Sequence, residues 1–169
     1  MRRRIGKNMP DVTARNKLLL IDANSLIHRA YHALPNLKSS KGMYTGAIYG
    51  FVNLFLRIVK EQQPTHVAAA FDLKAPTFRH KLYEPYKGTR KPMDAELAMQ
   101  FEPLKELLAL MKVKTVSLEG YEADDILGTL SAKFDDDTII LTGDRDSFQL
   151  VSDTTRVFWT KKGVSDIEA

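Results

Sequence analysis

The sequence contains no cysteine among its 169 residues. Disulfide bonds, thiolate metal sites and cysteine nucleophiles are therefore excluded. The four histidines show no spacing that is typical of a zinc site. Long apolar runs are also missing, and the longest early one, residues 18–21, is far too short to cross a bilayer. We therefore expect a soluble, cytoplasmic protein that has no contact with a membrane.

An excess of charge of one sign is missing from most of the chain. The net charge of +4 comes from residues 1–15, which hold five basic side chains and one acidic side chain, whereas the 20 basic and 20 acidic residues that follow balance. We expect residues 1–15 to be a disordered basic extension, with weak non-specific binding to nucleic acid as the alternative. Residues 16–169 are long enough for one domain with a substantial core.

Short apolar runs alternate with amphipathic stretches along the chain. The apolar runs predict strands at residues 17–22, 66–72, 113–118, 138–142 and 155–160. The amphipathic stretches predict helices after a cap at Ser25, at about 45–60, at 94–111, at 122–133 and near Ser147. Pro103 is expected to kink the helix over 94–111 or to mark where one helix gives way to another. Strands that alternate with helices are typical of a parallel α/β sandwich.

Acidic residues follow four consecutive predicted strands, at or just beyond the carboxyl end of each. They are Asp22, Asp72, Glu122, Asp124, Asp125, Asp144 and Asp146. The carboxyl ends of parallel strands meet at the sheet edge where ligands bind. Carboxylates gathered there repel one another unless a cation neutralises them, and their oxygens are ligands of hard divalent ions. An isolated acidic cluster is more often a solvated surface, but this convergence predicts a site for two metal ions.

A basic and aromatic segment, residues 74–91, interrupts the alternation directly after Asp72. It contains six lysines and arginines, one acid and three interleaved aromatic residues. Cations bind backbone phosphates, and aromatic rings stack on unpaired bases. The alternative is an exposed loop whose aromatic side chains pack on the domain. Beside a metal site, the segment indicates metal-dependent hydrolysis of phosphodiesters.

Five stretches together resemble one known family in their order and spacing. They are LLLIDANSLIHRAYHAL, YTGAIYGFVNLFLRI, AAFDLKAPTFRHKLYEPYKGTRKPM, EGYEADDILGTL and LTGDRDSFQLV. The chain resembles the 5′-nuclease (flap endonuclease) family, above all the branch that forms the amino-terminal 5′→3′ exonuclease domain of bacterial DNA polymerase I. This resemblance implies a PIN-like (resolvase-like) three-layer α/β/α fold with a mainly parallel sheet and a helical arch insertion at about residues 75–100. Residues 16–169 would be the catalytic domain, incomplete at its carboxyl end, because family members continue with two more metal-binding aspartates and a helix-hairpin module.

The resemblance also implies an activity and roles for individual residues. Family members hydrolyse DNA phosphodiester bonds as 5′→3′ exonucleases and flap endonucleases near single-strand to double-strand junctions, in replication and repair. The seven strand-end acids match the family's ligands for Mg²⁺, with Mn²⁺ as a substitute and two ions in the complete site. Lys87 and Arg90 match catalytic arch residues. DNA contacts are expected from Arg79, Tyr83, Tyr86, Lys87 and Arg90.

The expected partner is DNA with a 5′ flap or 5′ end, or an RNA primer–DNA junction. The family also implies a monomer associated with the bacterial nucleoid, in a parent protein that carries a polymerase. Three alternatives stay open: a catalytically impaired DNA-binding fragment, a PIN-like ribonuclease and a phospho-acceptor signalling domain. The arch disfavours the ribonuclease, and the basic insertion disfavours the signalling domain.

Overall fold

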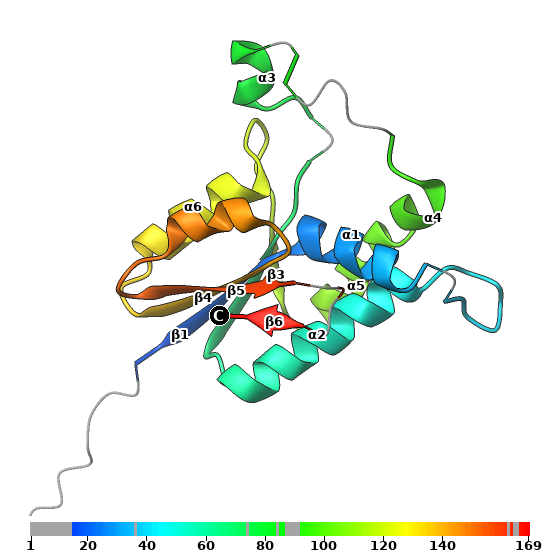
Figure 1. Cartoon of the computed structure of the whole chain (residues 1–169), viewed down its shortest axis with the longest axis horizontal. Coiled ribbons are helices and arrows are strands. Elements are labelled where there is room, and N and C mark those ends of the chain that lie inside the picture. Colours follow the sequence, from blue (N-terminus) through cyan, green and yellow to red (C-terminus); the bar gives the residue numbers. More distant parts are fainter. Residues whose placement is uncertain are drawn as a thin grey trace, which may run out of the picture.

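A computed structural model describes residues 15–35, 37–73, 75–83, 85–86, 92–161, 163 and 166–169. Of the predicted basic extension, residues 1–15, only Arg15 is therefore described. The described strands form one six-stranded sheet in the order β3-β2-β1-β4-β5-β6 (Figure 1). The strands are β1 (Lys17–Asp22), β2 (His66–Ala70), β3 (Lys114–Val116), β4 (Asp137–Thr142), β5 (Thr155–Thr160) and β6 (Ile167–Glu168).

Strands β1 to β5 are parallel, as the sequence pattern predicted, and β6 pairs with β5 in antiparallel orientation. The strand β6 was not predicted, because two residues are too few to show an apolar alternation. Between β1 and β4 the chain order reverses, since β1 leads outward to β2 and β3 whereas β4 leads to β5. In open α/β sheets, ligands bind beyond the carboxyl ends of the strands at such a switch point.

Helices cover both faces of the sheet (Figure 1). One layer contains α1 (Ala23–Ala33), α2 (Gly46–Gln62) and α5 (Phe101–Leu110), and α6 (Ala123–Lys133) covers the other face. The shorter elements are α3 (Phe78–Leu82), α4 (Ala95–Ala98) and the 3₁₀ helix η1 (Arg145–Leu150). None of the helices described here is both long enough and apolar enough to cross a membrane.

Alternating side chains of the strands supply the two cores between these layers. In β1, Leu19 and Ile21 pack in the cluster beneath α1, α2 and α5, whereas Leu18 and Leu20 pack against α6. A parallel strand that is buried on both faces is apolar at nearly every position, which is why β1 was recognisable in the sequence. The predicted three-layer α/β/α arrangement is confirmed.

The first helix begins immediately after β1, because the last residue of the strand caps it. The Asp22 carboxylate accepts a hydrogen bond from the backbone N–H of Ser25 at 3.1 Å. The helix cap is therefore Asp22 and not Ser25, the residue that the sequence pattern favoured. This double role fixes Asp22 at the switch point of the sheet.

The helix predicted over residues 94–111 is two helices, and the division lies at Gln100 rather than at Pro103. Pro103 lies in the first turn of α5, where a missing N–H leaves no intrahelical hydrogen bond unmade. Gln100 is buried, and its side-chain oxygen accepts hydrogen bonds from the N–H groups of Ala47 at 2.9 Å and Ile48 at 3.3 Å. A side chain more than fifty residues away therefore caps the amino terminus of α2.

Candidate metal centre and nucleic-acid interface

A cavity of about 490 Å³ lies at the carboxyl ends of β1, β2 and β4. Five of the seven predicted metal ligands line it: Asp22, Asp72, Glu122, Asp124 and Asp144. The strand order explains this convergence, because β1 lies between β2 and β4 and α6 begins at the same edge. We call this space the acidic cavity.

Asp22 is the most buried of these acids, with 4% of its surface exposed. Its Oδ2 accepts a hydrogen bond from Thr142 Oγ1 at 2.8 Å, and the same threonine oxygen accepts one from the N–H of Asp144 at 2.9 Å. Burial raises the pKa of Asp22 and the charge of Asp72 adds to this effect, whereas the hydrogen bonds oppose it. One buried threonine thus connects the acid that ends β1 with the acid that follows β4.

Asp72 and Asp124 meet at the amino terminus of α6. Asp72 Oδ1 accepts a hydrogen bond from the N–H of Ala123 at 2.6 Å, where the helix dipole favours negative charge. Burial raises the pKa of Asp124 to about 6, and the charges of the other four acids act in the same direction. The carboxylates of the acidic cavity therefore repel one another.

The donor set of the acidic cavity fits a hard divalent cation. Carboxylates and water are the ligands that Mg²⁺ prefers, and five carboxylates line this space. Within the part of the chain that the structure describes, however, no group of three or more histidine, aspartate or glutamate side chains is arranged to hold an ion. Asp22 and Asp72 instead accept hydrogen bonds from protein donors. The chemistry fits a metal, and metal binding stays a prediction.

Two predicted ligands do not line the acidic cavity. Asp125 faces Arg79 of α3, whose guanidinium donates hydrogen bonds to both of its carboxylate oxygens, at 2.7 and 2.8 Å. Asp146 is exposed in η1, where its N–H donates to Asp144 Oδ1 at 3.0 Å. Successive residues of a helix point roughly 100° apart. The adjacent acids of α6 therefore face different surroundings, which strand-end position alone does not reveal.

The segment after β2 approaches the acidic cavity from above the sheet edge. Tyr86 donates a hydrogen bond from its hydroxyl to Glu122 Oε2 at 3.2 Å, and Arg79 Nη1 lies 3.6 Å from the same oxygen. The side chain of Tyr83 is exposed at 63% and is available for stacking. Of the predicted arch contacts, Lys87 and Arg90 lie outside the described residues.

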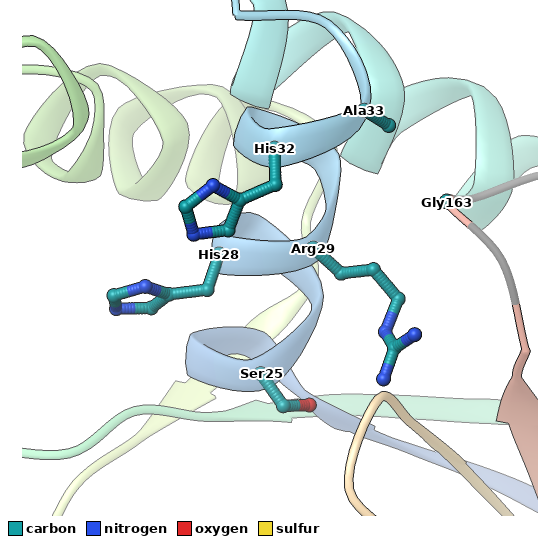
Figure 2. A pocket seen from close by; sticks show the side chains of 6 residues that line it. All are labelled: Ser25, His28, Arg29, His32, Ala33 and Gly163. Carbon is teal, nitrogen blue, oxygen red and sulfur yellow. The ribbon is translucent and has the colours of Figure 1, made fainter.

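Five further residues line the acidic cavity: Asn24, Ser25, His28, Met93 and Ala123. Of these, the sequence pattern had singled out only Ser25, as a helix cap. A second cavity, of about 410 Å³, shares Ser25 and His28 with the acidic cavity and continues along α1 to His32. Figure 2 shows the imidazoles of His28 and His32 on one side of α1 and the Arg29 side chain on another. In the sequence, the four-residue spacing of His28 and His32 indicates that both histidines lie on one side of a helix.

Arg29 and Ser25 hold the turn that carries Asp144. The N–H of Gly143 donates to Ser25 Oγ at 2.8 Å. The carbonyl oxygen of Gly143 accepts hydrogen bonds from Arg29 Nη2 at 2.5 Å and from Trp159 Nε1 at 3.2 Å. Both polar groups of this peptide unit are therefore satisfied, and the turn has a defined position at the edge of the acidic cavity.

Comparison with known sequences finds a matching family and curated relatives. Residues 17–168 match the family model described as 5′-3′ exonuclease, N-terminal resolvase-like domain. DNA polymerase I of Geobacillus stearothermophilus is 45% identical over 158 residues, which are 92% of this chain and 18% of that protein. DNA polymerase I of Bacillus subtilis (strain 168) is 42% identical over 160 residues, or 93% of this chain. The chain spans 18% of the length of these curated relatives.

Comparison with solved structures gives the same fold. A crystal structure of the T5 D15 protein, co-crystallized with metal ions, superposes with a TM-score of 0.65. The match covers 85% of this chain and 55% of that chain at 24% identity, so it is evidence for the fold alone. The predicted PIN-like, resolvase-like fold is confirmed.

Proposed function

Because this chain belongs to the family of 5′-3′ exonuclease N-terminal resolvase-like domains, we propose that it hydrolyses DNA phosphodiester bonds with the help of divalent metal ions. It acts as a 5′→3′ exonuclease and flap endonuclease within a longer protein similar to DNA polymerase I. One observation carries the proposal: five strand-end carboxylates line a single cavity, and a segment with exposed aromatic and basic side chains contacts its rim.

The acidic cavity is the proposed site of Mg²⁺. The residues that would hold the ions are Asp22, Asp72, Glu122, Asp124 and Asp144. When bound, divalent ions stabilise the charge that develops on the phosphate and lower the pKa of a coordinated water molecule. Thr142 fixes Asp22 relative to Asp144, and the amino terminus of α6 holds Asp72. These protein donors keep the carboxylates at one edge of the sheet.

The proposed substrate is DNA with a single-stranded 5′ flap or 5′ end. Tyr83 is exposed and stacks on an unpaired base in this proposal. Lys87 and Arg90 follow Tyr86 closely in the sequence and would contact backbone phosphates there. A site that takes both an unpaired base and a phosphate beside the metal ions is suited to a junction between single-stranded and double-stranded DNA.

The test compares binding and cleavage of labelled 5′-flap DNA by the 169-residue chain. We expect product with Mg²⁺ or Mn²⁺ and none with EDTA. Asp144→Asn should lower the single-turnover rate by a factor on the order of 100 without weakening DNA binding, because it removes a proposed metal ligand. Asp136→Asn is the matched control, since Asp136 precedes β4 at the opposite edge and accepts hydrogen bonds from Asn16. Equal rates for the two variants would overturn the proposal.

A second candidate function is DNA binding without cleavage. The observation in its favour is that no three histidine, aspartate or glutamate side chains of the described ranges are arranged to hold an ion. Saturable flap binding with no product at any Mg²⁺ or Mn²⁺ concentration would support this candidate. A flap strand made of RNA tests the ribonuclease alternative, which predicts faster cleavage of RNA than of DNA.

A further inference from the structure

Arg79 and Asp125 form a two-point contact between α3 and the start of α6. Arg79 Nη1 lies 2.7 Å from Asp125 Oδ2, and Nη2 lies 2.8 Å from Oδ1. The two side chains are 32% and 22% exposed, so the contact is partly shielded from solvent. A guanidinium that matches both oxygens of a carboxylate gives a stronger and more directional contact than a single ion pair.

The same carboxylate also fixes the residue that begins α6. Asp125 Oδ2 accepts a hydrogen bond from the N–H of Glu122 at 2.9 Å, in the arrangement of a capping box. Glu122 is nearly buried, with 9% exposed, and its own carboxylate lines the acidic cavity. Asp125 is therefore bonded on one side to Arg79 and on the other to the backbone of a proposed metal ligand.

Independent contacts dock α3 on the loop before α6. The N–H of Phe78 donates to the carbonyl of Gly120 at 2.9 Å, and the rings of Phe78 and Tyr121 lie 5.8 Å apart. Thr77, which precedes α3, is buried. The Arg79 guanidinium lies 4.5 Å from the Phe78 ring, so stacking further restricts its position. The start of the arch segment is thus a docked element.

We propose that Arg79 and Asp125 are positioning residues, which together fasten α3 to α6 and orient the Glu122 carboxylate toward the acidic cavity. This role rests on the proposed function, because it takes Glu122 as a metal ligand. It differs from the expectation from the sequence, in which Arg79 contacts DNA and Asp125 binds metal. It also couples the arch to the metal site, since a ligand that moves α3 changes the position of Glu122.

Charge and position make opposite predictions for the loss of Arg79. Nη1 lies 3.6 Å from Glu122 Oε2, so removing the positive charge would by itself strengthen the attraction of the cavity for cations. Loss of positioning would instead weaken metal binding, typically by about 10-fold for a residue that holds a ligand in place. A fall in metal affinity in Arg79→Gln therefore reports position rather than charge.

The experiment is a double-mutant cycle on Mn²⁺ affinity, measured by calorimetry with the 169-residue chain. We expect Arg79→Gln and Asp125→Asn each to weaken Mn²⁺ binding by about 10-fold, and the double variant to be no weaker than either single variant. Arg57→Gln is the matched control, because Arg57 forms an ion pair with Glu61 on the surface of α2. Additive losses would show that Asp125 is itself a ligand, and unchanged affinity in Arg79→Gln would also overturn the proposal.

Two further measurements keep this proposal separate from the proposed function. Amide exchange over Phe78–Leu82 should accelerate in Arg79→Gln and in Asp125→Asn, and this readout needs neither metal nor DNA. If the wild-type chain binds no Mn²⁺, the proposed function fails, and unchanged exchange in α3 would overturn the positioning role as well. If Arg79→Gln cleaves flap DNA with a raised KM but unaltered kcat and Mn²⁺ affinity, Arg79 is a DNA contact and the positioning role is wrong.

Discussion

Asp22 and Thr142, which are 120 residues apart in the sequence, share a hydrogen bond of 2.8 Å between Oδ2 and Oγ1. Thr142 is completely buried and Asp22 almost so. The same hydroxyl oxygen accepts the N–H of Asp144 at 2.9 Å. A neutral side chain therefore connects the Asp22 carboxylate with the backbone of Asp144 and satisfies polar groups that burial would otherwise leave unpaired.

We expect Thr142→Val to lower the free energy of unfolding by about 1–3 kcal/mol, because it leaves a buried carboxylate oxygen and an N–H without this partner. Thr138→Val is the matched control: Thr138 lies in the same strand and is 1% exposed, and its hydroxyl has no hydrogen-bond partner in the described structure. Urea denaturation should show that Thr138→Val leaves the free energy of unfolding unchanged or raises it. Equal losses from both valines would contradict the role of Thr142.

Gln100→Met should destabilise the chain by about 1–2 kcal/mol, since it keeps the side-chain length but removes the cap of α2. Amide exchange at Ala47 and Ile48 should accelerate, because their N–H groups lose the Gln100 oxygen. Gln149→Met, on the exposed surface of η1, is the control. If exchange at Ala47 stays at the wild-type rate, Gln100 does not hold the start of α2.

Gly46→Ala and Gly128→Ala should have opposite effects, although both glycines lie in helices. A Cβ at Gly46 would lie 2.0 Å from the carbonyl oxygen of Leu34, so α2 would have to move away, at an expected loss of about 1–3 kcal/mol. A Cβ at Gly128 meets only the end of the Leu150 side chain at 3.2 Å. We expect that alanine to gain up to about 1 kcal/mol from helix propensity. Thermal unfolding gives the order of the two variants, and the reverse order would refute this account.

Without metal, the contribution of Asp124 to stability should fall as the pH rises from about 4 to about 7. Burial raises the pKa of Asp124 from 3.8 to about 6, so the folded chain binds this proton more tightly than the unfolded chain does. The stabilising effect is fully present below the lower value and is lost as the pH passes the higher one. The raised pKa of Asp22 acts in the same direction.

Asp124→Asn should flatten this profile, with a higher melting temperature than wild type near neutral pH and no difference near pH 4. Thermal melts in EDTA measure it, with Asp153→Asn in an exposed turn as the control. Added Mg²⁺ should raise the melting temperature of wild type more than that of Asp124→Asn, because binding to the folded state alone is stabilising. A profile unaffected by the substitution would show that Asp124 does not titrate in this range.

The two central strands, β1 and β4, were predictable because they are buried on both faces. Residues 18–21 are apolar and Asp22 follows them, and β1 has the predicted bounds, Lys17–Asp22. The acids at the strand ends followed from the same pattern, since parallel strands bring their carboxyl ends to one edge. Contacts between distant segments could not be predicted in this way. Gln100, which lies between α4 and α5, caps α2 from a distant segment, and no local sequence pattern indicates this contact.

The orientation of individual side chains could not be predicted from the sequence either. Asp124 and Asp125 are adjacent, yet one lines the acidic cavity and the other binds Arg79. Both are acidic residues just beyond the end of a predicted strand, and they differ only in the direction in which each side chain leaves α6. Arg79 satisfied the rule for a phosphate contact, because a basic residue among aromatic residues is typical of nucleic-acid binding. Its carboxylate partner lies 46 residues further along the chain.

The segment between β2 and α5 is attached to the rest of the fold near both of its ends. Phe78 is bonded to Gly120 near its start, and Gln100 holds α2 at its end. The first anchor joins the loop before α6, on one face of the sheet, and the second joins α2, on the other face. The segment therefore links the two helical layers from outside the sheet, in addition to the strands that lie between them. Because the two anchors share no partner, substitutions at Phe78 and at Gln100 should have additive effects on stability.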